Sequence, residues 1–355
     1  SSLDPDSFDA ENIPEPVSTQ RQAENRQYLE ETSAFFLSKY KLNKNSSINK
    51  FSILNIGARI DDNSVYGDHV TVRTSLVKNF YNWNFKMLYG NAIQTPSNRL
   101  VYGGWGPNQS SPDVAPEKAT TIEGSIGYKH KISNYILSVY QVNITDKMIN
   151  NALGAFNVGT GEIFGIDIHS SHTKEVNNSK SWIEKMKLTS YLSYITGKED
   201  IIEVIDDELV NTGRDSIGDL APIRLRGAFT TYIKSSISSS LFTTLAFRYV
   251  SEIDNYYTNP IDTTDSYSVF DLILGANDIF VNGLNLNVTI TNLFNTIYYH
   301  PGIKTADAGN TPTTSEITED DVTYTIYDNV LNGEIYNSLL PQPGRLYNLA
   351  ITWNF

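Results

Sequence analysis

The sequence ends in Tyr347-Asn348-Leu349-Ala350-Ile351-Thr352-Trp353-Asn354-Phe355, where apolar or aromatic residues alternate with small or polar ones. A strict period of two over this length is typical of a β-strand whose two faces meet different surroundings. In a transmembrane barrel the apolar face meets lipid and the polar face lines the lumen. In a soluble β-sandwich the apolar face would instead pack in a hydrophobic core. The final strand alone does not distinguish a barrel from a sandwich, so the rest of the sequence is needed.

The same alternation recurs upstream, for example in residues 284–291, where Leu, Leu, Val and Ile alternate with Asn, Asn, Thr and Thr. Most candidate strands are ten to fourteen residues long, close to the roughly 9–11 residues that a tilted strand needs to cross a bilayer. The pattern therefore favours the barrel. We predict thirteen strands, at about 27–40, 49–61, 67–78, 80–93, 119–130, 135–148, 160–173, 184–197, 223–235, 239–252, 267–278, 284–296 and 345–355.

The predicted connections alternate between short and long. Tight turns are expected at Asn79, Lys131–Asn134, Ser236–Ser238 and Ile279–Gly283, and long loops at 94–118, 198–222, 253–266 and 297–344. Short periplasmic turns opposite long extracellular loops are the outer-membrane pattern. On this interpretation the C-terminus is periplasmic and residues 1–26 are an extracellular loop remnant. Because an odd number of strands cannot close an antiparallel barrel, we also expect the chain to be incomplete.

Composition agrees with an all-β membrane protein. Tyrosine is frequent, with 22 residues, beside 15 Phe and 4 Trp, which suits aromatic belts at membrane interfaces. A run of about 18 apolar residues, as a transmembrane helix needs, does not occur. The net charge of −13 argues against a nucleic-acid partner, since phosphate binding needs a basic surface.

Six segments, in order, resemble the conserved segments of TonB-dependent outer-membrane receptors, and the final strand resembles the terminal signal of outer-membrane barrels, formed here by Tyr347, Leu349, Ile351, Trp353 and Phe355. The segments are Leu54–Asp61, Tyr89–Ser97, Ala115–Glu117 with Gly124, Gly165–Ile168, Leu220–Arg224 and Asn292–Tyr298. The resemblance implies an antiparallel transmembrane β-barrel of about 22 strands closed by a plug. Residues 27–355 would be its C-terminal portion.

The resemblance also implies partners. Outer-membrane lipid would surround the barrel. The plug and about nine further strands would come from another fragment or chain. An inner-membrane TonB complex would act through that part. The function implied is energy-coupled import of a scarce nutrient, such as a siderophore or a corrinoid. A receptor-like barrel serving as a structural subunit of a larger outer-membrane assembly, and a passive porin, stay open as alternatives.

No enzymatic motif is present, and we expect neither catalysis nor a cofactor. The resemblance also disfavours haem, because haem receptors of the family carry a His between two family segments, and the corresponding stretch here, from Ile93 to Val114, contains no His. The acidic runs 199–208 and 316–321 suit solvated loops better than a calcium site, and no metal ligand set is predicted. Loop aromatic and polar residues are the candidate ligand contacts, because rings give a large contact area with a polar handle. They are Gln94, Arg99, Tyr102, Trp105, Arg248, Tyr256, Tyr257 and Tyr299. An interfacial aromatic belt is the alternative role for Tyr299, and pairing with a plug carboxylate is the alternative for Arg248.

Overall fold

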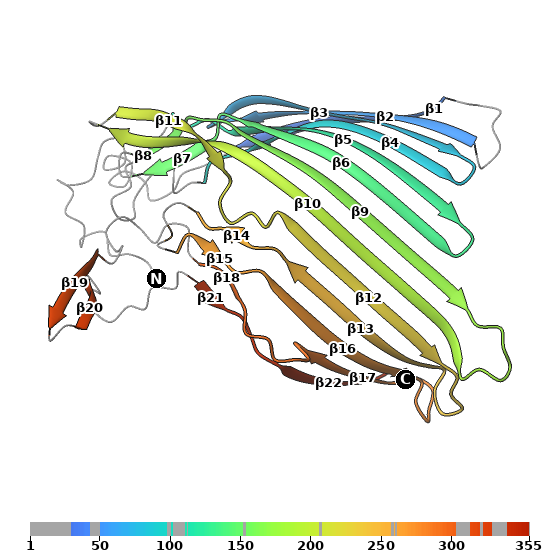
Figure 1. Cartoon of the computed structure of the whole chain (residues 1–355). Coiled ribbons are helices and arrows are strands. Elements are labelled where there is room, and N and C mark those ends of the chain that lie inside the picture. Colours follow the sequence, from blue (N-terminus) through green and yellow to red (C-terminus); the bar gives the residue numbers. More distant parts are fainter. Residues whose placement is uncertain are drawn as a thin grey trace, which may run out of the picture. The chain divides into compact units, whose positions relative to one another are not determined.

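The structure is a computed structural model of the whole chain (Figure 1). It describes residues 30–42, 50–97, 101, 111, 113–151, 154–205, 208–256, 259, 261–302, 313–319, 322–328 and 339–354. Among these residues no helix is long and apolar enough to cross a membrane.

The regular elements that can be bounded in the described residues are strands. They are β1 Glu31–Lys41, β2 Lys50–Asn63, β3 Gly67–Phe80, β4 Trp83–Gln94, β5 Glu117–His130, β6 Ser133–Thr145, β7 Met148–Asn151, β8 Gly154–Asn157, β9 Gly161–Glu175, β10 Ile183–Ile205, β11 Glu208–Ser216, β12 Ile223–Ile233, β13 Ser240–Val250, β14 Ile253–Asp254, β15 Thr263–Thr264, β16 Tyr267–Asn277, β17 Leu284–Thr291, β18 Tyr299–Pro301, β19 Thr313–Glu319, β20 Val322–Asp328, β21 Leu339–Pro341 and β22 Leu346–Trp353.

One 14-stranded sheet dominates, in the order β1-β2-β3-β4-β5-β6-β9-β10-β12-β13-β16-β17-β22, with β11 paired to β10. The thirteen strands of this path are the thirteen predicted from the sequence, each with bounds shifted by a few residues apart from β10, which is longer. Neighbours in the path follow one another along the chain apart from short hairpins, so the sheet is a meander. The all-β, antiparallel prediction is confirmed.

The chain divides into two compact units. Unit 1 comprises residues 1–126, 138–164 and 197–215. Its strands β2 and β3 pair along their whole length and separate polar from apolar residues. Asn55, Gly57, Arg59 and Asp61 face Ser75, Arg73, Thr71 and His69, while Leu54, Ile56, Ala58 and Ile60 face Leu76, Thr74, Val72 and Val70. A small apolar cluster of Val101, Val114 and Ala155 lies in the loop region of this unit.

Unit 2 comprises residues 127–137, 165–196 and 216–355. Strands β12, β13, β16, β17 and β22 lie side by side in it (Figure 1). Register places Leu284, Leu286, Val288 and Ile290 opposite Trp353, Ile351, Leu349 and Tyr347. We call this side the apolar face. The other side carries Asn285, Asn287 and Thr289 opposite Thr352, Ala350 and Asn348, and we call it the polar face.

The end of β22 lies at a short turn of the same unit. The backbone N–H of Asn354 donates to the carbonyl oxygen of Gly283, at 2.9 Å, beside the turn between β16 and β17. Gly283 has φ +83°, and a Cβ there would lie 1.9 Å from the Asn354 carbonyl oxygen, so the turn requires glycine. The last strand therefore ends on the side of short connections, as the sequence predicted.

Three expectations about connections are wrong, wholly or in part. Ser133 and Asn134, expected in a turn, are the first residues of β6, and that turn is at residues 131–132. Asn79 does not lie in a turn: it belongs to β3 and pairs with Asn84, and the turn is at residues 81–82. Residues 198–222 are not one loop, because β10 continues to Ile205 and returns as β11. The β-branched residues Ile201, Ile202, Val204 and Ile205 supply strand propensity between the acidic ones.

Candidate functional site: an arginine cluster on the polar face

Three arginines meet on the polar face of unit 2. In the hairpin of β12 and β13, Arg226 lies directly opposite Arg248, and Arg224 lies opposite Val250. Side chains alternate along a strand, so Arg224 and Arg226 share a face with Arg248. Like charges directly opposite each other on a sheet are destabilising. The arrangement therefore weakens this hairpin unless something negative comes close.

Carboxylates near the arginines have other partners. On the same face, Asp271 of β16 lies opposite Ala246, and its Oδ1 accepts a hydrogen bond of 2.8 Å from the backbone N–H of Asn292. Tyr191, opposite Arg226, donates to Oδ1 of Asp167 at 2.8 Å. Within the described part of the chain, no ion pair includes Arg224, Arg226 or Arg248. The three guanidinium groups are thus left without a carboxylate partner in direct contact among these residues.

Arg248 is the most enclosed of the three. Its Nε is buried and has no hydrogen-bond partner among the described residues. A buried donor without a partner costs about 1–3 kcal/mol, and more when it is charged. Buried polar groups are nearly always satisfied in folded proteins. An anionic or carbonyl oxygen at this position would satisfy the donor.

Aromatic side chains form a wall beside Arg248. The Tyr267 hydroxyl lies 3.0 Å from Nε2 of His300, and the ring centroids of Tyr267 and Tyr298 are 4.5 Å apart. Burial, together with the charge of Arg248, lowers the pKa of His300 below its usual value. His300 is therefore neutral near pH 7, so it adds hydrogen-bonding capacity to the wall without adding charge.

The aromatic wall packs against a small buried cluster, which we call the base. Ala221, Val250 and Ile253 form a buried cluster against which Tyr267 packs. The loop after β14 is fixed from the other side, since a Cβ on Gly218 would lie only 2.5 Å from the Cα of Tyr256. Oδ1 of Asp219 accepts a hydrogen bond of 3.1 Å from the Tyr256 backbone N–H. Tyr267 and the loop that carries Tyr256 are thus fixed by these contacts.

A family model described as TonB dependent receptor-like, β-barrel, matches residues 2–293. The chain belongs to this family. Its members form outer-membrane β-barrels, and they are transport receptors rather than enzymes.

Solved structures of receptors share the fold. The FrpB iron transporter from Neisseria meningitidis (F3-3 variant) matches with a TM-score of 0.62 and 14% identity, over 97% of this chain and 49% of that one. The siderophore receptor PiuA from Acinetobacter baumannii gives 0.62 and 14%, over 92% and 43%. The copper transporter OprC gives 0.60 and 13%, over 92% and 48%. The chain thus spans about half the length of each receptor.

The structure places the predicted contact residues of this receptor barrel in different surroundings. Arg248 belongs to the arginine cluster, and Tyr256 lies in the loop that borders the base. Tyr299 is the first residue of β18 and is 40% exposed; one residue along the strand, His300 contacts Tyr267. Gln94 is an exposed residue at the end of β4 in unit 1. Arg99, Tyr102, Trp105 and Tyr257 lie outside the described residues.

The structure describes four of the five residues of the predicted C-terminal barrel signal. Tyr347, Leu349, Ile351 and Trp353 share the apolar face of β22 and are all well exposed, and Phe355 lies outside the described residues. Residues 1–26, predicted as a loop remnant, also lie outside them.

Sequence reasoning did not identify Arg224, Arg226, Tyr267 or His300 as site residues. A signal for Arg226 was present. The predicted strands 223–235 and 239–252 are symmetric about residue 237, which already places residue 226 opposite residue 248. Tyr267 and His300 are different, because their contact depends on how the loop after β17 returns to the barrel.

Proposed function

We propose that this chain is the C-terminal portion of an outer-membrane receptor that imports a scarce nutrient with energy from the TonB complex. The nutrient class that best fits is a negatively charged chelate, such as a ferric siderophore. The observation that carries the proposal is the group of three arginines without ion-pair partners among the described residues. Guanidinium groups bind carboxylate and catecholate oxygens in planar, two-point fashion, and neighbouring rings add contact area.

The aromatic wall supports a bulky ligand rather than a small anion. Tyr267, Tyr298 and His300 have ring centroids within 4.5–5.9 Å of one another. Such a surface binds organic parts of a ligand, while the arginines bind its oxygens. The loop aromatics Tyr256 and Tyr299 are proposed as outer contacts. Gln94, Arg99, Tyr102, Trp105 and Tyr257 are proposed as contacts from other loops.

The rest of the receptor is proposed to complete the barrel. The sheet order ends at β1 and β22, each with one neighbour. Both are the outer members of a path of thirteen strands, and an open edge in hydrocarbon costs several kcal/mol for each unpaired backbone group. We propose that further strands of the same receptor cover these edges, that a plug fills the lumen, and that the C-terminus faces the periplasm. In this arrangement residues 27–355 form the barrel portion and residues 1–26 an extracellular loop.

Uptake by whole cells tests the proposal. Cells that depend on the receptor containing this chain are given radiolabelled ferric complexes of catecholate and hydroxamate siderophores, with and without a protonophore. We expect binding that survives the protonophore and import that does not. Arg226→Gln and Arg248→Gln should each weaken binding about tenfold or more, since a charged hydrogen bond contributes about 1.5–3 kcal/mol.

Arg345→Gln is the matched control, because the guanidinium of this exposed arginine lies 3.4 Å from the Tyr347 hydroxyl, and the hydrogen bond to Asn295 comes from its backbone N–H, which the substitution keeps. Equal loss in the control would show that the cluster has no special role. A receptor that assembles with partner proteins but imports no chelate, with or without the protonophore, would establish the structural subunit instead.

A further inference from the structure

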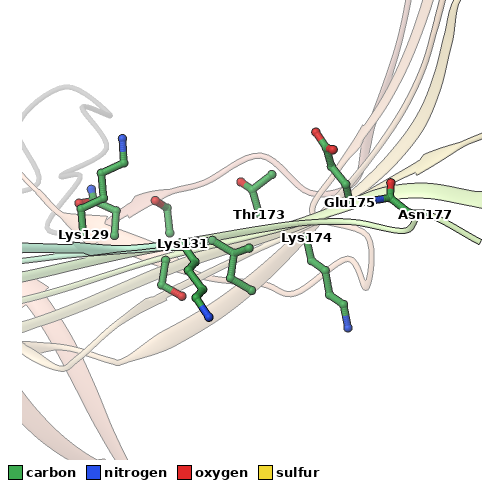
Figure 2. Close-up of a pocket in the computed structure, with 10 residues that line it drawn as sticks. Lys129, Lys131, Thr173, Lys174, Glu175 and Asn177 are labelled. Carbon is green, nitrogen blue, oxygen red and sulfur yellow. The ribbon is translucent and has the colours of Figure 1, made fainter. Parts of the chain in front are cut away.

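A second basic region of unit 2 lies at the short turn between β5 and β6. An open cleft of about 870 Å³ is formed there by the turn and by the end of β9. Its lining includes Lys129, Lys131, Ser133, Lys174 and Glu175. Figure 2 shows Lys131 and Lys174 on one side of the sheet and Lys129, Thr173 and Glu175 on the other.

The side with Lys131 and Lys174 is the apolar face. In β9, Asp167 belongs to the polar face, because it binds Tyr191, which lies opposite Arg226. Lys174 is an odd number of residues from Asp167 and so belongs to the opposite face. Higher on that face, Ile168 is exposed, as is Leu137 of β6. The two lysines thus stand at the end of an apolar surface.

Aromatic and polar side chains lie close to the two lysines, at the same end of the strands. His172, on the face of Lys174, lies 2.9 Å from the Ser133 hydroxyl and packs edge-on against Tyr135, with centroids 5.2 Å apart. The turn is held against β9 by a backbone hydrogen bond of 2.8 Å from Thr173 to Ile132. Tyrosine at the boundary of an apolar band is what a membrane–water interface favours.

Neither lysine has an ion-pair partner within the described ranges, although the chain carries a net charge of −13. The nearby Glu175 points to the other side of the sheet (Figure 2). Two unpaired ammonium groups, a hydroxyl–imidazole pair and an apolar surface leading away from them match one chemistry. That chemistry is a phosphate headgroup with acyl chains.

We propose that Lys131 and Lys174, with Ser133 and His172, bind the phosphate headgroup of an anionic phospholipid in the membrane leaflet on the short-turn side. The lipid tails lie along the apolar face beside Tyr135 and Leu137. This inference rests on the proposed membrane orientation of the barrel, but it does not depend on which nutrient the receptor imports. The site would fix the depth of the barrel at this leaflet.

Native mass spectrometry of the receptor containing this chain tests the inference. The receptor is extracted into detergent micelles with equal amounts of phosphatidylglycerol and phosphatidylcholine, and the retained lipids are counted. We expect preferential retention of phosphatidylglycerol. The double variant Lys131→Glu/Lys174→Glu should weaken this binding at least about tenfold, as expected when each surface lysine contributes about 1 kcal/mol toward anionic lipid.

Lys187→Glu is the matched control. Lys187 is an exposed lysine of the same unit, but register places it opposite Thr230 on the polar face. It should leave phosphatidylglycerol retention unchanged. Equal retention of the two lipids, or equal loss in the control, would overturn the inference. Displacement of the lipid by millimolar inorganic phosphate would also overturn it, since the site would then bind a free anion.

Siderophore import is measured on the same variants to separate the two proposals. If phosphatidylglycerol binds as expected while no chelate is imported, the lipid site stands and the proposed nutrient does not. If import is normal in the wild type and phosphatidylglycerol is not retained, only the lipid site is wrong. On SDS gels run without heating the sample, a folded barrel migrates differently from the unfolded chain. This shift shows that each variant is folded, so that a loss of lipid reports on binding.

Discussion

Arg59 on the polar strand face of unit 1 and the two facing arginines of unit 2 differ in their partners. In unit 1, Nε of Arg59 lies 2.6 Å from Oδ1 of Asp61, and its Nη2 lies 3.3 Å from Oε1 of Glu31. Asp61 also accepts a hydrogen bond of 2.5 Å from Ser33. In unit 2, Arg226 faces Arg248 across the hairpin, and no carboxylate among the described residues forms an ion pair with either.

This difference in ion pairing distinguishes charged residues that stabilise the fold from charged residues that are available to bind a ligand. Arg59 neutralises a carboxylate that is only 10% exposed, so it contributes to stability where it stands. Arg226 and Arg248 repel each other and leave a buried donor unpaired. Residues held in an unfavourable arrangement tend to lie at functional sites, where a ligand or partner supplies the missing interaction. The comparison is therefore the basis for choosing unit 2 as the ligand site.

The largest expected effect tests whether the apolar face meets lipid and the polar face does not, because the comparison of the arginines depends on this assignment. Ile351 lies opposite Leu286 on the apolar face, and Thr352 lies opposite Asn285 on the polar face. Replacing Ile351 by Arg should cost roughly 2–4 kcal/mol of folding free energy if the residue lies near the middle of a bilayer. Replacing Thr352 by Arg should cost far less. The measurement is reversible unfolding by denaturant in lipid vesicles.

Thr352→Arg also serves as the control for that experiment, because it adds the same side chain one position away. Equal costs for the two variants would mean that the faces do not differ in their surroundings. Arg59 and the arginine cluster could not then be compared as lumen-facing groups.

A smaller effect separates the two kinds of arginine directly. Arg59→Gln should lower stability by about 1 kcal/mol, because Asp61 loses its charged partner while keeping the Ser33 hydroxyl. Arg248→Gln should leave stability unchanged or raise it slightly, since the repulsion by Arg226 is removed. Unfolding curves of both variants in the same lipid check this. A loss of stability in Arg248→Gln as large as in Arg59→Gln would contradict the division into structural and ligand-binding charges.

The sequence predicted the strands well because their period of two is a local property. The thirteen strands follow from the alternation of side chains, and the turn between β12 and β13 could be placed to within a residue. It predicted the extension of β10 badly, because acidic residues there were interpreted as a solvated loop. Glu199 and Asp200 in fact form ion pairs with Lys147 and Arg214.

The candidate site was predicted only in part for a physical reason. Arg248 could be found because it interrupts an apolar and small-residue strand. The contact of Tyr267 with His300 joins residues 33 positions apart through the pairing of β18 with β21, which no local pattern encodes. Whether a charge is paired is likewise a property of the assembled sheet. The sequence contains many carboxylates, and only the side-chain distances show that none in the described ranges forms an ion pair with the three arginines.

The smallest expected effect concerns pH and lies at the edge of the arginine cluster. Burial and the charge of Arg248 lower the pKa of His300, so the unfolded chain binds this proton more readily than the folded one. The stabilising effect of neutral His300 is complete above its usual pKa of about 6.5 and is lost as the pH falls toward the lowered value. We therefore expect a lower unfolding temperature at pH 5 than at pH 7.5, and a smaller difference in His300→Gln. Lys234→Gln is the control, since this side chain binds the Asn178 carbonyl oxygen far from the cluster. If the pH difference is the same in His300→Gln as in the wild type, other groups cause it, and His300 is not held neutral by burial and the charge of Arg248.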